Sequence, residues 1–338
     1  MKAVFLVKNG AANDAFEIRE AEKPKAGAEE VLIKVEGFGL NFADVMARLG
    51  LYKDCPPLPA ILGYDIVGRV EETGENVTNL KVGDRVTAMT RFGGYAEYAI
   101  TDARAAAKIP EQMDVSVAGA LTTQYCTAYY CAEEMVRLHE GDRVLVHSAA
   151  GGVGTALVQL AKRKKCIIYG TVGSDEKVSF LKEQGVDFPI NYRKHDFAKE
   201  IKKISNGERL DVVFDAVGGD YVKKGFKLLG AGGRLVLYGA AQMAGKNILG
   251  KIKVGLGFGL YHPAPLMMKS KSILGVYLLQ IGDYRPAMLK RCLENVVQLT
   301  EAGELSPGIG KKFPFEKVGE AHAHLESRQS IGKIVVTI

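Results

Sequence analysis

Ser148-Ala149-Ala150-Gly151-Gly152-Val153-Gly154 is the stretch that decides the fold. It follows a strand-like apolar run at 143–147 and precedes an amphipathic pattern at 152–164 that predicts a helix. Glycines in such a turn let the backbone approach a pyrophosphate, which the free N–H groups and the positive end of the helix stabilise. Ala149 replaces the first glycine of the usual G-x-G-x-x-G pattern, so the match is not strict. A tight glycine turn without a ligand is the alternative interpretation.

Strand-like and helix-like segments alternate after this turn. The expected strands lie at 166–171, 210–214 and 234–238, and the expected helices at 176–184, 197–205 and 221–229. Repeated strand–helix–strand units predict an α/β fold with a doubly wound parallel sheet.

The first 110 or so residues have a different texture. Short β segments at 31–35, 66–70 and 84–88, broken by glycine and proline, predict a barrel-like β domain. From Pro265 the chain returns to isolated strands (273–279 and 333–338) and one helix (286–301), and we expect this tail to rejoin the β domain.

Composition is that of an ordinary folded protein, with 47% hydrophobic and 25% charged residues in a length that allows two domains. The five cysteines contain no C-x-x-C pair, so neither a disulfide framework nor a zinc knuckle is indicated. The opening residues lack a signal-peptide pattern, and charged residues and prolines interrupt the most apolar window, 248–268. We therefore expect a cytoplasmic protein without a membrane span.

The net charge of +6 comes from one segment, because residues 221–282 contain nine Lys or Arg and no Asp or Glu. No nucleic-acid motif accompanies this charge, so nucleic-acid binding is not expected. Within 245–271, lysines alternate with apolar residues, a pattern that also suits contact with an anionic membrane surface. Glycines at 250, 255, 257 and 259 argue against a stable helix, so we favour a mobile loop over an acceptor pocket.

The residues after the second strand of the α/β series bear on the choice of cofactor. Asp175 could accept hydrogen bonds from ribose hydroxyls, as in NAD enzymes, although acids are also common in the first turn of a helix. Ser174 is expected as the N-cap of that helix. Lys177 could reach a 2′-phosphate, which favours NADPH.

Metal ligands are scarce in the first domain. The first 138 residues contain no histidine, and Cys55, Cys126 and Cys131 have no cluster spacing. We therefore expect no catalytic or structural zinc.

Several segments together resemble the zinc-free quinone oxidoreductase branch of the medium-chain dehydrogenase/reductases, which includes zeta-crystallin. They are Gly141–Leu145, Ala149–Gly154 with Gln159 and Lys162, Gly39–Asp44, Gly50–Tyr52, Ile190–Tyr192 and Leu325–Arg328. Within the branch, residues 41–52 with the following 56–59, together with 313–318, are most similar to the vesicle amine transport protein-like group.

This resemblance implies a GroES-like β-barrel catalytic domain (1–122 and 265–338), an NADP-binding Rossmann domain (123–264) and a homodimer. It places Gly173, Ser174, Lys177, Tyr192 and Arg328 around the 2′-phosphate, and Gly151, Gly152 and Val153 at the pyrophosphate. It places seven residues along the ribose and nicotinamide: Asn41, Thr127, Val217, Tyr238, Gly239, Ala240 and Tyr277. Zinc-dependent relatives have a cysteine near Asn41 and a histidine near Tyr64, and both are absent here.

Some of these residues also have purely structural interpretations. Asn41 could cap the helix that begins at Phe42, and Tyr52 and Tyr64 could be half-buried core aromatics. Arg328 could be an exposed cation. His322 and His324 are expected on the surface.

The expected reaction is hydride transfer from C4 of NADPH to a quinone, or to the β-carbon of an enal or enone. Asn41, Tyr52 and Tyr64 are the candidate catalytic residues, with a tyrosine hydroxyl stabilising the negative charge that develops on the acceptor oxygen. Proton delivery from solvent is equally acceptable. Two alternatives stay open, an alcohol dehydrogenase and an NADPH-binding membrane or partner protein with little catalytic activity.

Overall fold

The computed structural model describes all 338 residues, and the chain divides into two compact units. The first unit contains Met1–Cys126 and Leu278–Ile338, and the second contains Thr127–Tyr277. No helix is long and apolar enough to cross a membrane.

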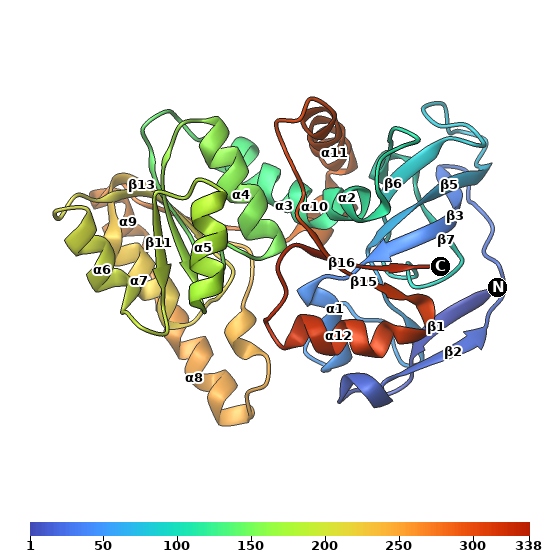
Figure 1. Cartoon of the computed structure of the whole chain (residues 1–338), viewed down its shortest axis with the longest axis horizontal. Coiled ribbons are helices and arrows are strands. Elements are labelled where there is room, and N and C mark those ends of the chain that lie inside the picture. The colour runs from blue at the N-terminus through green and yellow to red at the C-terminus, as the bar shows by residue number, and fades with distance from the viewer. The chain divides into compact units, whose positions relative to one another are not determined.

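The first unit is built mainly on antiparallel strands, with one parallel pair at the edge of its larger sheet (Figure 1). A seven-stranded sheet has the order β15-β16-β3-β5-β6-β8, with β7 paired to β3. Its strands are β3 (Glu30–Gly39), β5 (Asp65–Thr73), β6 (Arg85–Met89), β7 (Tyr98–Asp102), β8 (Ala106–Lys108), β15 (Ile309–Pro314) and β16 (Lys333–Thr337). A smaller sheet, β2-β1-β4, consists of β1 (Lys2–Leu6), β2 (Phe16–Glu20) and β4 (Ala60–Ile61).

Buried apolar side chains of the strands form the core of this barrel-like domain. In β7 the pattern Tyr98–Asp102 alternates between half-buried and buried positions, as expected for a strand with one face toward a core. Val31, Ile33 and Phe38 of β3 lie in that core. The helices of the unit are α1 (Phe42–Arg48), α2 (Val115–Ala120), α10 (Leu278–Tyr284), α11 (Pro286–Glu301) and α12 (Val318–Glu326).

The second unit has a six-stranded parallel sheet in the order β11-β10-β9-β12-β13-β14. The strands are β9 (Arg143–Val146), β10 (Ile167–Val172), β11 (Phe188–Asn191), β12 (Leu210–Asp215), β13 (Leu229–Leu237) and β14 (Ser272–Gly275). Successive strands leave β9 in both directions, so the sheet is doubly wound, as the sequence predicts.

Helices cover both faces of this sheet. Figure 1 shows α4 (Gly152–Arg163) and α5 (Asp175–Glu183) on one side, and α6 (Phe197–Ile204) and α7 (Asp220–Leu228) on the other. The short α3 (Cys126–Tyr129) lies at the boundary between the units, within a helical run that includes π-helical turns at Leu121–Tyr125 and Tyr130–Met135.

The prediction that the tail rejoins the β domain from Pro265 is wrong for its first part. Residues 272–275 form β14, which pairs with β13 in the parallel sheet, and the expected strand at 273–279 ends early because α10 begins at Leu278. A short apolar run predicts a strand, but its sequence does not say which sheet it will join.

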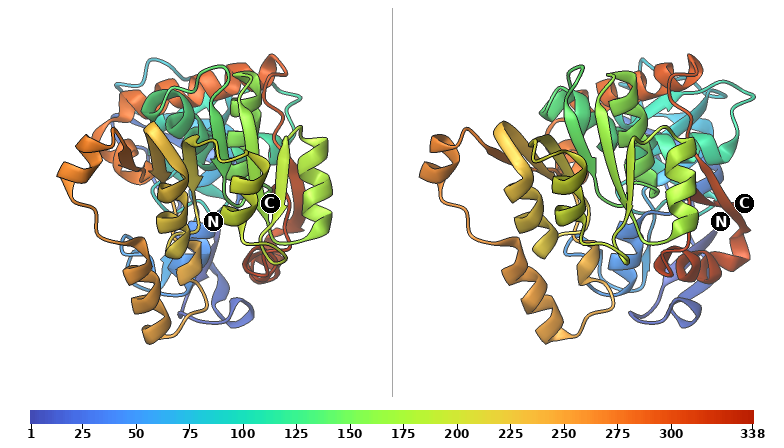
Figure 2. Two further views of the ribbon diagram at one scale, coloured as in Figure 1. Left: turned by 90° about the vertical axis from the view of Figure 1, so that its left-hand side faces the viewer. Right: turned by 60° about the vertical axis from the view of Figure 1, so that its left-hand side comes forward.

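The expected loop at 245–271 is also wrong, because most of it is helical. It forms α8 (Ile248–Phe258) and α9 (Pro263–Met268), drawn in orange in Figure 2. Asn247 caps α8 by accepting a hydrogen bond from the Gly250 N–H at 2.9 Å. A Cβ on Gly257 would come within 2.8 Å of the Gly219 backbone. Close packing against the Gly219 turn therefore explains glycine at 257, although the intrinsic propensity of glycine disfavours a helix.

Candidate functional site

The predicted cofactor residues of the second unit all follow the carboxyl ends of its strands, apart from Thr127 in α3. The predicted residues that follow β9, β10 and β11 are Gly151, Gly152, Val153, Gly173, Ser174, Lys177 and Tyr192. Those that follow β12, β13 and β14 are Val217, Tyr238, Gly239, Ala240 and Tyr277. Ligands of open α/β sheets bind at this edge, near the strand where the winding direction reverses. That strand is β9, which carries the glycine-rich turn.

The glycine-rich turn begins α4, with Gly151 as the N-cap. The first N–H groups of a helix have no acceptor within it, so those of Gly152 and Val153 are available to an anion. A Cβ on Gly154 would lie only 2.2 Å from the Ser148 carbonyl oxygen. Glycine at 154 therefore allows the helix to begin directly against the preceding turn.

The Asp175 carboxylate is already engaged by its own chain. It accepts a hydrogen bond from the Asn191 side-chain amide at 2.8 Å and forms an ion pair with Lys194. These contacts hold the pKa of Asp175 below its ordinary value, with the Lys194 hydrogen bond as the first cause. Ser174 is the N-cap of α5, as expected, and accepts from the Lys177 N–H at 3.3 Å.

Basic and aromatic side chains gather next to Gly173. A Cβ on Gly173 would lie 2.7 Å from the Tyr192 hydroxyl and 3.6 Å from Arg193 Nε. Lys177 is half-buried, and burial lowers its pKa. The carboxylate of Glu176 acts in the opposite direction, and the positive charge of Arg193 acts in the same direction as burial. Two cations that raise each other's energy in this way suit a site for a doubly charged phosphate.

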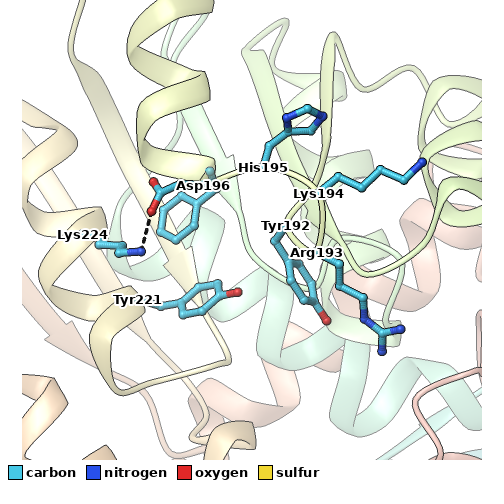
Figure 3. A pocket seen from close by; sticks show the side chains of 8 residues that line it. Tyr192, Arg193, Lys194, His195, Asp196, Tyr221 and Lys224 are labelled. Carbon is cyan, nitrogen blue, oxygen red and sulfur yellow. Dashed lines mark hydrogen bonds and ion pairs between the residues drawn. The ribbon is translucent and has the colours of Figure 1, made fainter.

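Arg193 is a candidate that the sequence reasoning missed. Its only signal was its position directly after Tyr192 at the end of β11. Figure 3 shows the Arg193 and Tyr192 side chains extending in the same direction, whereas Lys194 extends away from them. A cavity of about 240 Å³ adjoins them and is lined by residues 192–197, Tyr221 and Lys224.

A buried polar network surrounds Asn41 in the first unit. Asn41 Nδ2 donates to Asp65 Oδ2 at 2.7 Å, and Lys333 Nζ donates to Asn41 Oδ1 at 2.8 Å. Lys333 also forms an ion pair with Asp65, and neither side chain has any exposed surface. Asn41 is the N-cap residue of α1, as the structural interpretation predicted, but its carboxamide is held by this network as well.

The two candidate tyrosines share an aromatic cluster. The rings of Tyr52 and Tyr64 lie 6.3 Å apart, and both contact Phe92, at 6.4 Å and 4.9 Å between centroids. Tyr52 is half-buried, whereas Tyr64 is 3% exposed. Tyr64 precedes Asp65 in the chain, so the cluster lies next to the network around Asn41.

The remaining predicted residues fall in different environments. Thr127 is buried, Tyr277 is 39% exposed, and Arg328 is exposed with a positive φ of 61°. Asn41 and Arg328 belong to the first unit, and the other cofactor candidates belong to the second.

His322 does not lie on the surface, so that expectation is wrong. Its side chain is fully buried, and Nε2 lies 3.1 Å from the Tyr95 hydroxyl. Burial lowers its pKa to about 3, which keeps the imidazole neutral. The five cysteines are free thiols, and no group of three or more His, Cys, Asp or Glu residues is arranged to hold a metal ion.

Comparison with known proteins assigns the chain to a family. Residues 27–111 match the model of the alcohol dehydrogenase GroES-like domain, and residues 152–294 match that of the zinc-binding dehydrogenases. Quinone oxidoreductase-like protein 2 of Mus musculus is 31% identical over 95% of this chain and 88% of its own length. The chain belongs to the quinone oxidoreductase branch of the medium-chain dehydrogenase/reductases. This confirms the resemblance read from the sequence.

Other members of this superfamily cover the chain equally well. The synaptic vesicle membrane protein VAT-1 homolog of Danio rerio is 37% identical over 93% of this chain, which spans only 65% of that protein. Escherichia coli quinone oxidoreductase, solved in complex with NADPH, is 26% identical with a TM-score of 0.87 and full coverage of both chains. The CurK enoyl reductase is 28% identical with a TM-score of 0.86, over 99% of this chain and 98% of its own.

Proposed function

We propose that this chain is an NADPH-dependent reductase that transfers a hydride to a quinone or to the β-carbon of an α,β-unsaturated carbonyl compound. The observation that carries the proposal is which partners surround the two charged residues after β10, Asp175 and Lys177. Asp175 is occupied by Asn191 and Lys194, while Lys177 lies within the field of Arg193. Such a site attracts the doubly charged 2′-phosphate of NADPH, whereas the 2′-hydroxyl of NADH offers its cations no charge to pair with.

The glycine-rich turn holds the pyrophosphate in this proposal. The N–H groups of Gly152 and Val153 and the positive end of α4 bind its charge. Gly173, Ser174, Lys177 and Tyr192 surround the 2′-phosphate, and Arg193 adds a guanidinium to the set. Bound NADPH supplies the hydride, and the residues of the chain bind it, orient it and stabilise the charge on the acceptor.

The candidate donors to the acceptor oxygen lie in the first unit. Tyr52 keeps part of its surface exposed, so its hydroxyl is the better placed of the two tyrosines to meet a substrate. Hydrogen bonds from such groups stabilise the charge that appears on a quinone or enone oxygen after hydride transfer. Since the first 138 residues lack histidine and no metal-ligand cluster is present, we propose that the reaction does not use zinc. This feature also counts against the alternative of a zinc alcohol dehydrogenase.

The acceptor class has support from two relatives. One solved neighbour is a quinone oxidoreductase and another is an enoyl reductase, and both reactions deliver a hydride to a conjugated acceptor. Oxidation of NADPH, followed by its absorbance, against quinones, enals and enones tests the proposal. Saturable turnover with either class supports it, and no turnover with any acceptor contradicts it.

We also propose a homodimer joined through the edge of the parallel sheet. β14 is an edge strand with β13 as its neighbour, so one row of its backbone groups is open to pairing with another strand. Light scattering at several concentrations tests this. A Pro substitution at Ile273 is expected to shift a dimer to monomer, and a wild-type monomer at all concentrations contradicts the proposal.

A second candidate role is binding to anionic membranes through α8 and α9. Ile248, Leu249 and Leu256 of α8 are 75%, 76% and 72% exposed, and Met267 and Met268 of α9 are also exposed. Large apolar side chains are rarely so exposed on a single helix, and lysines at 246, 251 and 253 accompany them without any acid. This composition suits an interface of anionic headgroups and acyl chains.

Co-sedimentation with phosphatidylcholine vesicles, with and without phosphatidylserine, tests the membrane role. Binding that requires phosphatidylserine and is lost with Leu249→Ser and Leu256→Ser supports it. No binding at low salt contradicts it, as does concealment of the same side chains by a second copy of the chain.

All five cysteines are free, which agrees with a reducing compartment, and we propose the cytoplasm.

A further inference from the structure

The ion pair between Asp65 and Lys333 has no exposed surface on either side chain. Moving two charges out of water is expensive, and well-packed neutral residues of similar volume are often no less stabilising than a buried pair. A contribution to the stability of the barrel is therefore a weak explanation for the presence of this buried ion pair. Its contacts with Asn41 suggest a different role.

Three neighbouring strands of the first unit bring the network together. Asp65 begins β5, Lys333 begins β16, and both strands pair with β3 around Gly39. The Lys333 side chain lies across that glycine, where a Cβ would meet its Cε at 2.2 Å. The lysine thus crosses the central strand to reach the carboxylate on its far side. Glycine at 39 leaves the space for this crossing.

Each end of the Asn41 carboxamide contacts one member of the pair. The amide nitrogen donates to the carboxylate of Asp65, and the amide oxygen accepts from the ammonium of Lys333. Both are charge-assisted hydrogen bonds, which are stronger and more directional than neutral ones. The opposite end of Asp65 is fixed too, since Oδ1 accepts from Thr122 Oγ1 at 2.6 Å and from the Thr123 N–H at 3.0 Å.

This arrangement determines which way the amide faces. If the carboxamide turned over, its NH₂ would face the ammonium and its oxygen would face the carboxylate. The second N–H of the Asn41 amide is therefore not bonded to the pair, and it points in a fixed direction. A donor that is already oriented stabilises a developing charge without having to reorganise.

We propose that Asp65 and Lys333 are positioning residues that hold the Asn41 amide as an oriented donor to the nicotinamide end of the cofactor or to the acceptor oxygen. The inference rests on the proposed function, because it takes Asn41 as a residue of that site. In this role Asp65 and Lys333 act through Asn41 and need not touch the cofactor or the substrate themselves.

A double-mutant cycle between the pair and Asn41 tests this proposal. Asp65→Asn with Lys333→Met removes both charges, keeps the side-chain volumes and leaves an oxygen for Thr122 and Thr123. Replacing both partners together avoids an unpaired buried charge, which could prevent folding. Asp84→Asn with Lys108→Met is the matched control, because it makes the same two changes at another ion pair of the barrel.

The expected result is a loss of about tenfold or more in kcat when Asn41→Ala is made in the wild type, and less than about threefold in the Asp65→Asn/Lys333→Met background. The charge-free variant itself should lose kcat by about the same factor as Asn41→Ala. It should melt close to the wild-type temperature, and the control pair should change neither quantity. A merely structural pair would lower the melting temperature and leave the effect of Asn41→Ala unchanged.

Equal effects of Asn41→Ala in the two backgrounds would overturn the proposal, and so would no effect of Asn41→Ala in the wild type. If the wild type reduces no acceptor, the proposed function fails, and the same cycle is measured in the dissociation constant for NADPH by nicotinamide fluorescence. Coupling between the pair and Asn41 in that constant supports the positioning role. Its absence overturns that role independently of turnover.

Discussion

Asp175 accepts a hydrogen bond from the side-chain amide of Asn191 at 2.8 Å, which joins the end of β11 to the first turn of α5. This contact turns the acidic residue that would distinguish an NAD enzyme into a structural group. The cations beside Gly173 are left as the charges that decide between the two cofactors. Cofactor preference should therefore depend on Lys177 and Arg193, and not on Asp175.

Substitution of Lys177 or Arg193 by Gln should weaken NADPH binding and leave NADH binding unchanged. A charge-assisted hydrogen bond contributes roughly 1.5–3 kcal/mol, so each loss should raise the dissociation constant for NADPH by about 10- to 100-fold. Fluorescence titration measures both constants. Lys194→Gln is the control, because it removes the same charge from a side chain that pairs with Asp175. An equal effect of all three substitutions would indicate that the positive charges act only through a general electrostatic field, and not through contacts with the 2′-phosphate.

Tyr52→Phe should lower turnover with little change in NADPH affinity. The substitution removes a hydroxyl that we place at the acceptor oxygen, and loss of one such donor lowers kcat by roughly 10²-fold. Steady-state kinetics with a quinone and an enone, together with an NADPH titration, check this. Unchanged turnover for every acceptor would remove Tyr52 from the mechanism and favour proton delivery by solvent.

Gly154→Ala should destabilise the second unit, because the new methyl group would meet the Ser148 carbonyl oxygen at 2.2 Å. Overpacking of this kind typically lowers the free energy of unfolding by about 1–3 kcal/mol. Gly255→Ala in α8 is the matched control, since a Cβ there has no atom within 4 Å and alanine favours a helix. Urea unfolding of both variants should show a loss for the first and none for the second.

Asp44→Asn should alter how stability depends on pH. Burial raises the pKa of Asp44 from 3.8 to about 7, so the folded chain holds a proton there that the unfolded chain releases between about pH 4 and 7. Stability from this group is therefore present below pH 4 and falls as the pH rises to 7. Asn stays neutral at every pH. Relative to wild type, the variant should gain about 3 kcal/mol between pH 5 and pH 8.

The stability of Asp44→Asn must be compared with that of the wild type at each pH, because His322 makes stability depend on pH in the opposite direction. Its folded pKa of about 3 lies below the ordinary 6.5, so its contribution to stability is lost as the pH falls. The two dependences oppose each other in the wild-type curve. Urea midpoints of wild type and Asp44→Asn at the same pH values isolate Asp44, and parallel curves would contradict the assigned pKa.

The sequence predicted the elements whose pattern is local. The helix expected at 286–301 is α11, and the glycine turn starts α4 between two strands as expected. Ser174 caps α5 for a reason that is visible in the sequence, because its side chain serves an N–H three residues away.

Features that depend on distant partners were beyond such reasoning. α8 forms where its glycines seemed to forbid a helix, because Gly257 packs on the Gly219 turn. His322 is buried by contact with Tyr95, which lies 227 residues away in the chain. Lys333 was read only as the first residue of a strand, and only the pairing of β16 with β3 shows that it reaches Asn41. A sequence pattern contains no information on such pairings.

Reductase activity and the preference for NADPH are tested together by comparing NADPH and NADH as hydride donors at limiting concentration, with a panel of quinones, enals and enones as acceptors. We expect saturable oxidation of NADPH by at least one acceptor class, with a kcat/KM about two orders of magnitude above that for NADH. Equal kcat/KM values for the two cofactors would contradict the roles of Lys177 and Arg193. Turnover with no acceptor would contradict the reductase itself.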